Sequence, residues 1–390
     1  MTEWKEYRLE DLYTFASGLS KPANEFGFGY PFLTFKDVFN NYFIPKELTE
    51  LVNSTQRERE SCSIKRGDVF LTRTSETAEE LGMSSVALMD YHEATFNGFT
   101  KRLRPKYNNA IWPEFIGYYL RWQRFRAHII AMASETTRAS LNNSMMATLP
   151  VTLPSLQEQK NIAAVLSSLD DKIDLLHRQN ATLEAMAEAL FRQWFVVEAK
   201  EEWEKRSLSS IADFLNGLAC QKHPPLNVTE RLPVLKIREL NSGIGQDVDW
   251  ASSAVSPEYI ITSGDVIFSW SGSLMVKIWS GENCILNQHL FKVTSGNYPK
   301  WFYYFWCKKH LAEFIAISES KATTMGHIKR GDLDKAEVLV PTESELVEMS
   351  EGMQPILGKF IFNQTQIRTL EKLRDTLLPK LMSGEVRLRR

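Results

Sequence analysis

Hydrophobic residues spaced alternately by four and three positions mark two long segments of the chain. The first runs from Ile162 to Trp194 and the second from Met349 to Leu381, with every seam position of the second 187 residues after its counterpart. This spacing is typical of the seam of a coiled coil, whereas a globular helix shows a wider apolar stripe. The pattern predicts two matched helices, each roughly 50 Å long at about 1.5 Å per residue, that act as a spacer.

Local signals indicate where each helix begins and ends. A capping box directly after a proline marks each start: Ser155 with Glu158, and Thr342 with Glu345. Pro379 has no counterpart in the first segment. We therefore expect the second helix to kink or end near Leu378, with Gly384 finishing the turn.

Each seam contains one asparagine. If the helices pair antiparallel about their common midpoint, residues whose numbers sum to 543 face each other, and Asn180 meets Asn363. We expect the two amides to hydrogen-bond across the coil and fix its register at some cost in stability. The alternative is that each asparagine faces solvent.

Short β-like runs and aromatic-rich helical stretches alternate before each long helix. PFLTFKDV, PVLKIREL and SGDVIFSW predict strands, and PEFIGYYLRWQRF and PKWFYYFWCKKHLAEF predict helices whose aromatic residues lie mostly in the core. The expected fold class is α+β, with two tandem-repeat lobes, each followed by a long helix, and the two helices paired as an antiparallel coiled coil. The expected boundaries are 1–153 and 201–340 for the lobes, and 154–200 and 341–390 for the helices.

The two lobes are copies of one ancestral unit. The opening residues of the first lobe recur in order in the second: Trp4, Leu9, Leu12, Phe15, Gly18 and Leu19 match Trp203, Leu208, Ile211, Phe214, Gly217 and Leu218. A Gly-Asp-Val turn also recurs at Gly67 and Gly264, as does an asparagine at Asn97 and Asn287. The offset slides from 199 to 187 along each lobe. A duplicated chain predicts two related faces for a repetitive partner.

Composition places the chain among ordinary globular proteins. It has 390 residues, a net charge of −2 and 43% hydrophobic residues, enough for a core in each lobe. No apolar run approaches the roughly 18 residues that span a bilayer, and the N-terminus is too charged for a signal peptide, so we expect a cytoplasmic protein without a membrane segment. The four widely separated cysteines predict buried free thiols: Cys62, Cys220, Cys284 and Cys307.

Charge is unevenly distributed. Acidic residues concentrate on the long helices, while the first lobe has locally basic stretches. These are the run from Lys101 to Lys106, and Arg121, Arg124, Arg126 and Arg138. Such patches can contact phosphates, although a charge run is more often a solvated face.

Signatures of catalysis are missing from the sequence. It has no Walker loop, no G-x-G-x-x-G, no H-E-x-x-H and no G-x-S-x-G. His289 and His327 have no nucleophile beside them in sequence, and no carboxylates have a recognisable metal spacing. We expect no catalytic residue, no metal and no cofactor in this chain.

The repeated W-x4-L-x2-[LI]-x2-F-x2-G opening, the GDV turn, the FNGF and LNQHLF segments and the stretch LPSLQEQKNIAAVLSSLDDKIDLLHRQN resemble the specificity subunit of type I restriction-modification enzymes. The likeness covers essentially the whole chain. Its most specific part is the start of the first long helix. The second helix departs from it, with Ser344 and Leu346 where Gln157 and Gln159 stand.

The resemblance implies a non-catalytic reader of DNA sequence. In that family each lobe reads one part of a bipartite double-stranded site, and the helices dock two methyltransferase (modification) subunits that bind S-adenosylmethionine and methylate adenine. Separate motor-nuclease (restriction) subunits cut the DNA. Two similar lobes on a stiff spacer also suit two half-sites about one helical turn (~34 to 36 Å) apart. Divergence between the lobes predicts an asymmetric site.

Base-reading residues are expected where the lobes differ, because shared residues maintain the shared fold. Arginine pairs with guanine and asparagine with adenine, at about 1 to 3 kcal/mol of discrimination each. For each candidate, a hydrogen bond that stabilises its loop is the alternative. The candidates in the first lobe are Arg73, Thr74, Ser75, Thr136, Thr137, Arg138, Asn142 and Asn143. Those in the second lobe are Trp270, Ser271, Ser273, Gln288, His289, Lys321, Thr323, Thr324, His327 and Lys329.

Two other readings remain open at this point. A two-lobed coiled-coil adaptor would bind only proteins, and a duplicated nuclease would need the carboxylate cluster that the sequence lacks. Polar and basic residues in the non-repeated loops favour the DNA reader over the adaptor.

Overall fold

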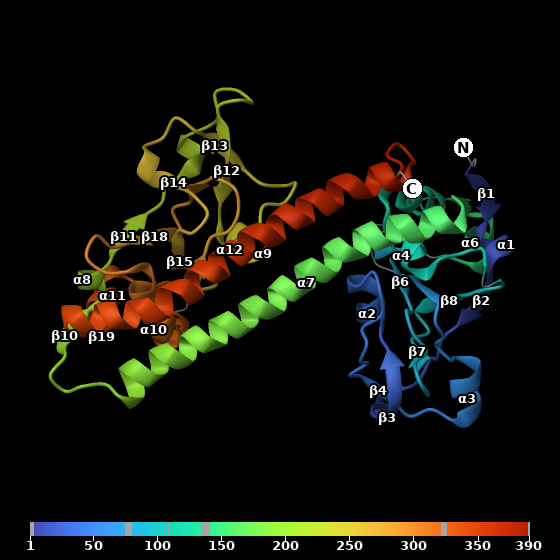
Figure 1. Cartoon of the computed structure of the whole chain (residues 1–390), viewed down its shortest axis with the longest axis horizontal. Coiled ribbons are helices and arrows are strands. Elements are labelled where there is room, and N and C mark those ends of the chain that lie inside the picture. The colour runs from blue at the N-terminus through green and yellow to red at the C-terminus, as the bar shows by residue number, and fades with distance from the viewer. Residues whose placement is uncertain (1–3, 75–79, 108, 134–140, 321–325, 389–390) are drawn as a thin grey trace. The chain divides into compact units, whose positions relative to one another are not determined.

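The structure is a computed structural model that describes residues 4–74, 80–107, 109–133, 141–320 and 326–388. The chain divides into two compact units (Figure 1). The first comprises residues up to 171 together with those from 372 onward, and the second comprises residues 172–371. Two long helices, α7 (Leu156–Arg192) and α12 (Glu343–Met382), each contribute to both units.

The first unit contains nine short strands and six shorter helices among its described residues. Its strands are β1 (Lys5–Arg8), β2 (Tyr13–Ser17), β3 (Phe26–Leu33), β4 (Leu51–Val52), β5 (Val69–Thr72), β6 (Ser84–Val86), β7 (Thr95–Phe96), β8 (Thr100–Pro105) and β9 (Pro150–Leu153). Its α-helices before α7 are α1 (Leu9–Leu12), α2 (Phe35–Asn40), α3 (Gln56–Ser61), α4 (Pro113–Arg121), α5 (Gln123–Ala133) and α6 (Asn143–Thr148).

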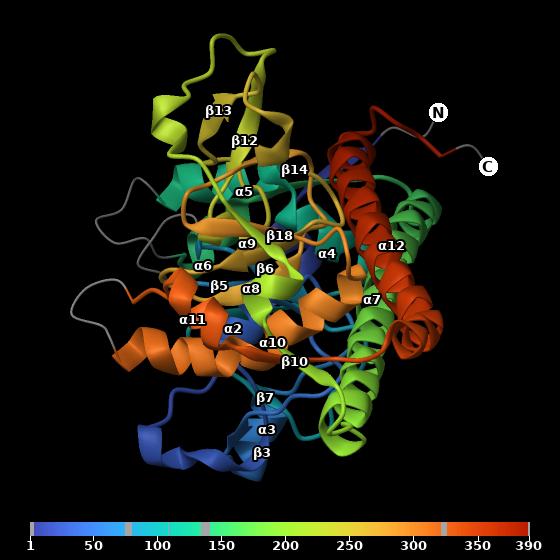
Figure 2. The same ribbon diagram turned by 90° about the vertical axis from the view of Figure 1, so that its left-hand side faces the viewer.

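The second unit repeats this plan, and Figure 2 shows its upper sheet with the labels β12, β13 and β14. Its strands are β10 (Glu204–Ser207), β11 (Asp213–Asn216), β12 (Arg231–Leu235), β13 (Trp250–Ser252), β14 (Ile260–Ile261), β15 (Val266–Ser269), β16 (Met275–Ile278), β17 (Cys284–Leu286), β18 (Leu290–Thr294) and β19 (Glu337–Val340). Its α-helices before α12 are α8 (Leu208–Ile211), α9 (Ile237–Ser242), α10 (Lys300–Ser320) and α11 (Arg330–Lys335).

One sheet has the same strand order in both units, whereas the other sheet has three strands in the first unit and four in the second. A four-stranded sheet runs β2-β8-β5-β6 in the first unit and β11-β18-β15-β16 in the second. A second sheet contains the one parallel pairing among the named strands of each unit, β3 with β7 and β12 with β17. An antiparallel pair, β1 with β9 or β10 with β19, joins the start of each lobe to its end. The expected α+β tandem repeat is confirmed.

A close crossing of two segments of the main chain explains why a glycine recurs in both lobes. The Leu19 amide donates to the carbonyl of Phe96 (2.8 Å), and the Gly98 amide donates back to Leu19 (2.7 Å). A Cβ on Gly18 would lie 2.3 Å from the Phe96 oxygen, so only glycine fits. Gly217 repeats the contact, because its Cβ would lie 2.3 Å from the carbonyl oxygen of Asn287.

The predicted Gly-Asp turns are also confirmed. Gly67 and Gly264 have φ values of +88° and +96°, which an L side chain rarely adopts. The following carboxylates close the turns, since Asp68 accepts the Lys65 amide and Asp265 accepts the Thr262 amide, both at 2.8 Å. β5 and β15 begin at the next residue.

Both long helices begin as the capping boxes predict. The Glu158 amide donates to Ser155 Oγ (3.3 Å), and Thr342 exchanges both bonds of the box with Glu345. Gln159, which is fully buried, fastens the start of α7 to the first lobe. Its side chain accepts the Trp112 amide (2.8 Å) and donates to the carbonyls of Ala110 and Pro154 (both 3.1 Å).

The expected end of the second helix near Leu378 is wrong. α12 continues through Pro379 to Met382, because a proline so close to the end removes only one intrahelical donor and Leu381 and Met382 are buried in the first unit. Gly384 follows the helix with a φ of +73°, as expected of a residue that ends it.

Antiparallel pairing of α7 with α12 is present in each unit. In the second unit, Ile173, Leu176, Ile367 and Leu370 form one buried cluster. In the first unit, seam residues of both helices join the lobe core: Ile162, Leu166, Leu377 and Leu381. These are pairs whose numbers sum to 543, which is the register predicted from the sequence.

The two seam asparagines are buried, so the solvent-facing alternative is wrong. Asn180 is 7% exposed and Asn363 is 0% exposed. The expected bond between the two amides is also wrong. Asn180 Nδ2 donates to the Phe360 carbonyl and Asn363 Nδ2 to Gln179 Oε1, each at 3.4 Å. Both amide oxygens are buried with no partner among the described residues. A role in fixing register stays a prediction.

A polar contact in the first unit corresponds to an apolar one in the second. Asp170 accepts bonds from the Tyr118 hydroxyl (2.6 Å) and from Arg374 Nη1 (3.0 Å). Burial, and then the bond to Asp170, raise the pKa of Tyr118. The residues 187 positions from Asp170 and Arg374 are Leu357 and Ala187.

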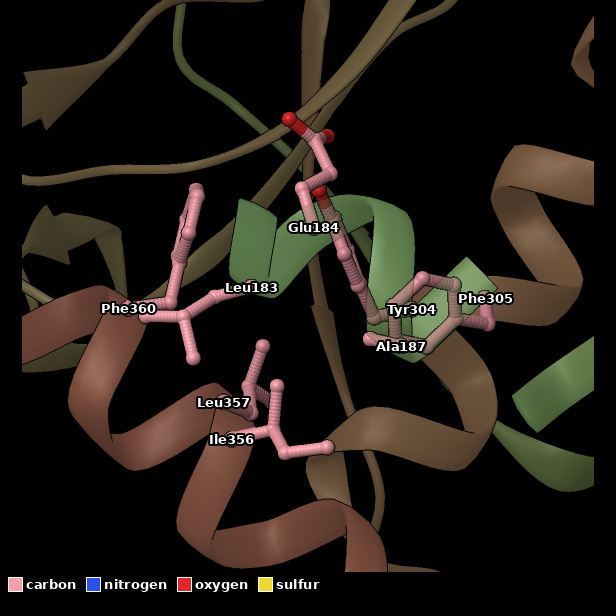
Figure 3. A pocket seen from close by; sticks show the side chains of 8 residues that line it. All are labelled: Leu183, Glu184, Ala187, Tyr304, Phe305, Ile356, Leu357 and Phe360. Atoms are coloured by element: carbon pink, nitrogen blue, oxygen red, sulfur yellow. The ribbon is translucent and has the colours of Figure 1, made fainter. Parts of the chain in front are cut away.

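Leu357 and Ala187 lie with Tyr304 around a small cavity in the second unit (Figure 3). Its volume is about 10 Å³. It is lined by apolar groups apart from Glu184 and the Tyr304 hydroxyl, and it is too small and too apolar to hold a ligand. We interpret it as imperfect packing.

The expectation about the cysteines is also met. All four cysteines are free and buried. None of the helices that the structure describes is long and apolar enough to cross a membrane.

Replacing Gly217 with alanine tests the main-chain crossing. We expect Gly217→Ala to lower the free energy of unfolding by about 1 to 3 kcal/mol, because the added methyl overlaps a carbonyl that the fold cannot move. Urea unfolding monitored by tryptophan fluorescence measures this loss. Gly245→Ala is the matched control, because nothing lies within 4 Å of its Cβ position. Equal stability of the two variants would contradict the role of the crossing.

A double leucine variant tests the seam asparagines. Asn180→Leu with Asn363→Leu should raise the free energy of unfolding by about 1 to 3 kcal/mol, because it removes two buried oxygens that lack partners. It should also loosen the register. Disulfide formation between Ile173→Cys and Leu370→Cys, compared with and without the leucines, measures the register. An unchanged yield would show that the asparagines do not set it.

Candidate nucleic-acid interface

Three loops meet beside one end of the four-stranded sheet in each unit, and we call this place the three-loop junction. In the first unit the Arg73 amide donates to the Phe99 carbonyl (3.0 Å), and the Leu141 amide donates to the Arg73 carbonyl (2.8 Å). In the second unit Trp270 is joined in the same way to His289 (3.4 Å) and Ile328 (3.1 Å). Main-chain bonds therefore hold equivalent loops in equivalent positions, whatever their side chains are.

Aromatic and polar side chains fill the junction of the second unit. The Trp270 ring lies 6.1 Å from the ring of His289, 6.3 Å from that of His327 and 5.7 Å from that of Phe291. Its indole nitrogen donates to Asn216 Oδ1 (3.1 Å). Trp270 is therefore fixed by packing on one side and by a hydrogen bond on the other.

His289 is oriented by two polar neighbours. Its Nδ1 lies 3.0 Å from Ser271 Oγ, and its Nε2 lies 3.4 Å from Gln288 Nε2. The ring is half-buried. Beside it, an isolated antiparallel β-bridge joins Ser271 to His327. This arrangement gives a rigid set of donors and acceptors of the kind that reads base edges.

The junction of the first unit is cationic. Arg73 makes no ion pair with any residue that the structure describes, and Lys101 Nζ donates to Ser17 Oγ at 2.6 Å. Lys101 is buried, and burial and then the charge of Arg73 lower its pKa, so of these two cations only the half-buried Arg73 reaches the surface. Beside them the Phe99 side chain is 63% exposed.

The structure brings together five of the candidates from the second lobe. These are Trp270, Ser271, Gln288, His289 and His327. In the first lobe only Arg73 lies at the junction itself, with Thr74 next to it in the chain. Ser273, Asn143 and Lys329 are exposed on loops or helix ends. Seven candidates lie outside the described residues: Ser75, Thr136, Thr137, Arg138, Lys321, Thr323 and Thr324.

Asn142 has a local structural bond. Its Oδ1 accepts the Met145 amide (2.8 Å) and so caps α6, which is the loop-stabilising alternative considered for every candidate. Asn142 is exposed and its amide nitrogen is not used in this bond, so its contact with DNA stays a prediction.

Sequence reasoning missed Phe99 and Lys101 as members of the junction. Phe99 follows Asn97 and Gly98, which are turn-forming residues between two strands, and that signal places it on a loop. Lys101 was grouped with a basic run rather than assigned its own position.

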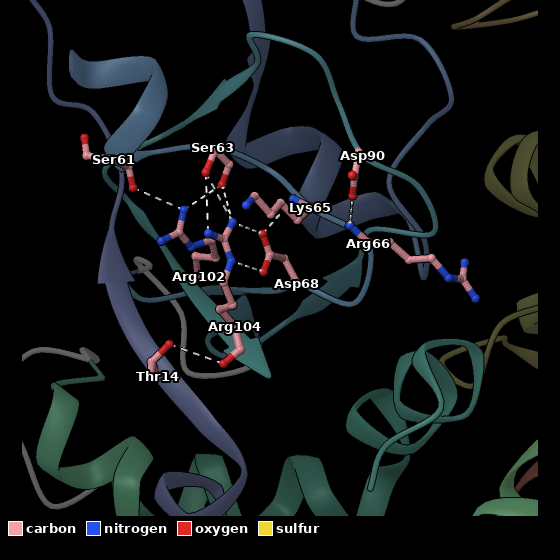
Figure 4. Close-up of polar contacts among 9 residues, drawn as sticks. All are labelled: Thr14, Ser61, Ser63, Lys65, Arg66, Asp68, Asp90, Arg102 and Arg104. Atoms are coloured by element: carbon pink, nitrogen blue, oxygen red, sulfur yellow. Dashed lines mark hydrogen bonds and ion pairs between the residues drawn. The ribbon is translucent and has the colours of Figure 1, made fainter. Parts of the chain in front are cut away.

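The basic run Lys101 to Lys106 is mostly internal, so neither the phosphate nor the solvated-face interpretation fits it. Arg102 is buried and donates to the carbonyls of Ser61 (3.2 Å) and Ser63 (2.6 Å) (Figure 4). Arg104 makes two bonds to the buried Asp68, at 2.8 and 2.6 Å. The bond to Asp68 raises the pKa of Arg104, whereas burial lowers that of Arg102.

The expected arginine patch on α4 and α5 is also largely structural. Arg121 donates to four main-chain carbonyls, those of Val38, Phe39, Asn41 and Ser84. Burial lowers its pKa to about 10. Arg126 donates to the Leu81 carbonyl, while Arg124 is exposed beside Trp122. Of the predicted patch, Arg124 alone among the described arginines presents a free charge to solvent.

The described residues contain no group of three histidine, cysteine or acidic side chains placed to hold a metal ion. His289 faces a serine hydroxyl, and no carboxylate of the described residues contacts its ring, so these side chains do not form a catalytic triad.

Paired arginine variants distinguish internal cations from interface cations. Arg102→Met should lower the free energy of unfolding by about 2 kcal/mol, because it removes the charge-assisted hydrogen bonds that the buried guanidinium donates to the carbonyls of Ser61 and Ser63. Arg73→Met should change it by less than about 0.5 kcal/mol, as expected for a surface position. Chemical denaturation measures both. A larger loss for Arg73→Met than for Arg102→Met would reverse the assignment.

Comparisons with known proteins agree with this architecture. The family model for the type I restriction modification DNA specificity domain matches residues 1–185 and 200–372. The MjaIX specificity subunit of Methanocaldococcus jannaschii is 25% identical over 99% of this chain and 94% of its own length. The HindI specificity subunit of Haemophilus influenzae is 20% identical over 99% of this chain and all of its own.

A solved structure has the same fold. The S subunit of a type I restriction-modification system from M. genitalium superposes with a TM-score of 0.62, at 15% identity, over 97% of this chain and 96% of that one. Because the family model matches most of the sequence, once in each half, the chain belongs to the type I restriction-modification DNA specificity family and carries two copies of its domain.

Proposed function

We propose that this chain is the non-catalytic subunit that selects the DNA sequence for a type I restriction-modification complex. Its two lobes read the two parts of an asymmetric, bipartite double-stranded site. Its long helices dock two methyltransferase subunits, which bind S-adenosylmethionine and methylate adenine, and motor-nuclease subunits join the complex to cut. The chain itself supplies no catalytic group and no cofactor.

One observation carries this proposal. The two three-loop junctions have the same main-chain bonds but different side chains: Arg73 and Phe99 in one, Trp270 and His289 in the other. An asymmetric two-part DNA site requires different base-contacting side chains in the two lobes, because identical side chains would select identical half-sites. The shared main-chain bonds hold these different side chains in equivalent positions.

The charge distribution supports a role for partner subunits. DNA-binding proteins normally gain affinity by neutralising phosphates with exposed lysine and arginine. Here Arg102, Arg104 and Arg121 are committed to internal acceptors, so the first lobe presents less positive charge than its composition suggests. We infer that the methyltransferase subunits supply much of the phosphate clamp.

Exposed apolar side chains on the long helices support the docking of protein partners. Within the second unit, Leu175 and Met186 of α7 and Val347 and Phe362 of α12 are exposed. Exposed large apolar side chains on a polar helix surface are typical of protein interfaces. These positions also suit the adaptor alternative, so they do not distinguish the two functions.

Sequencing of methylated DNA tests the proposal. The chain should be co-expressed with its methyltransferase subunit in a host that lacks adenine methylation, and the modified motif then read from the genome. We expect one asymmetric motif in two parts separated by unspecified bases. Arg73→Ala should relax specificity in one part only and His289→Ala in the other, each by roughly 5- to 150-fold, the equivalent of about 1 to 3 kcal/mol.

Arg57→Ala is the matched control, because Arg57 is an exposed arginine on α3 that makes no ion pair with another described residue. It should leave the motif unchanged. A palindromic or uninterrupted motif, or one substitution that alters both parts, would contradict the reading of one part by each lobe. A complex that forms but neither binds nor modifies DNA would favour the adaptor.

A further inference from the structure

Phe99 is an exposed aromatic side chain on a rigid loop of the first lobe. Its amide donates to Asn97 Oδ1 (2.7 Å), and its carbonyl accepts the Arg73 amide (3.0 Å). The preceding residue, Gly98, is bonded to Leu19 and has no room for a Cβ, which would meet Ser20 Oγ at 2.5 Å. The backbone on both sides of Phe99 is therefore fixed while its ring projects into solvent.

The ring has no aromatic partner within the described part of the chain, and this distinguishes it from its counterpart. His289 occupies the same place in the second lobe, where Trp270 and Ser271 hold its ring. The first lobe has Arg73 in place of Trp270, so no side chain of the described residues covers Phe99 in the same way. Both lobes therefore have a ring at this position, and the ring is exposed in the first lobe.

The surroundings of Phe99 indicate what covers it in the complex. Arg73 lies at the same junction, is half-buried and makes no ion pair with a described residue. A phenyl ring beside a cation suits a stacked base step with a phosphate next to it. A purely apolar protein surface would leave Arg73 without a partner.

We propose that Phe99 is a wedge that inserts into a base step of the DNA half-site read by the first lobe. This inference rests on the proposed function and deepens it. The ring partly unstacks one step, while Arg73 contacts an adjoining phosphate or base edge. A phenyl ring neither donates nor accepts hydrogen bonds, so it cannot distinguish bases by their edges. It instead favours a base step that is easily deformed, such as a flexible pyrimidine–purine step.

The experiment uses the chain in complex with its methyltransferase and a duplex that contains the methylated motif. 2-Aminopurine is placed at successive positions in the half-site that Arg73→Ala alters, and once at the methylated adenine. With the unsubstituted chain we expect fluorescence to rise severalfold at one step of the half-site. Phe99→Ala should return that step to the level of the free duplex and weaken binding by roughly tenfold, while Phe99→Leu retains part of both.

Two controls isolate the effect of the ring. Tyr107→Ala removes a similarly exposed ring (62%) that lies past the opposite end of β8, and it should behave like the unsubstituted chain. The signal at the methylated adenine should survive Phe99→Ala, because it reports the partner's action rather than the wedge.

Three outcomes would overturn the inference. They are no unstacked step in the half-site, a fluorescence profile unchanged by Phe99→Ala, or loss of the methyltransferase from the complex in that variant, which would make Phe99 a protein contact. A bipartite motif that persists in any of these cases leaves the proposed function standing. Absence of any bipartite motif with the unsubstituted chain defeats the proposed function itself.

Discussion

The arrangement of both candidate interfaces depends on one steric constraint, the contact of Gly18 or Gly217 with a neighbouring main chain. A Cβ at either position would lie 2.3 Å from a carbonyl oxygen, so the two segments can approach only where the side chain is absent. The close approach allows Leu19 and Leu218 to exchange main-chain bonds with the loop that carries Phe99 or His289. The loop is thereby positioned without any contribution from its own side chains.

Internal ion pairs reduce the charge that each lobe presents to solvent. The Gly-Asp turn places Asp68 against Arg104 in the first lobe and Asp265 against Lys292 in the second (3.0 Å). The carboxylate is common to both lobes, whereas the cation comes from different positions on the paired strand. Positive residues near such a turn therefore stabilise the fold.

The sequence alone predicted those elements whose hydrophobic residues are periodic or whose residues recur in both halves of the chain. Seam spacing gave both long helices and the register that joins Ile173 to Leu370, and the internal repeat located the Gly-Asp turns. It failed where the partners come from distant segments. The acceptors of Arg102 are carbonyls of residues some forty positions earlier, so a local count of charges could not show that it is internal. Phe99 was missed because an apolar residue normally indicates a core position.

The contact of Asp170 with Arg374, matched by Leu357 and Ala187 in the other half, makes the two long helices chemically distinct although they descend from one ancestor. Suppose that α12 of one molecule paired with α12 of another in the same antiparallel register. Each Arg374 would then face Leu357 in the place that Asp170 of α7 occupies within one molecule. The guanidinium charge would have no carboxylate partner. The chain thus discriminates between its own first helix and a copy of its second. In a duplicated protein, a long helix could pair with the equivalent helix of a second molecule. The Asp170–Arg374 contact favours pairing of the two helices within one molecule instead.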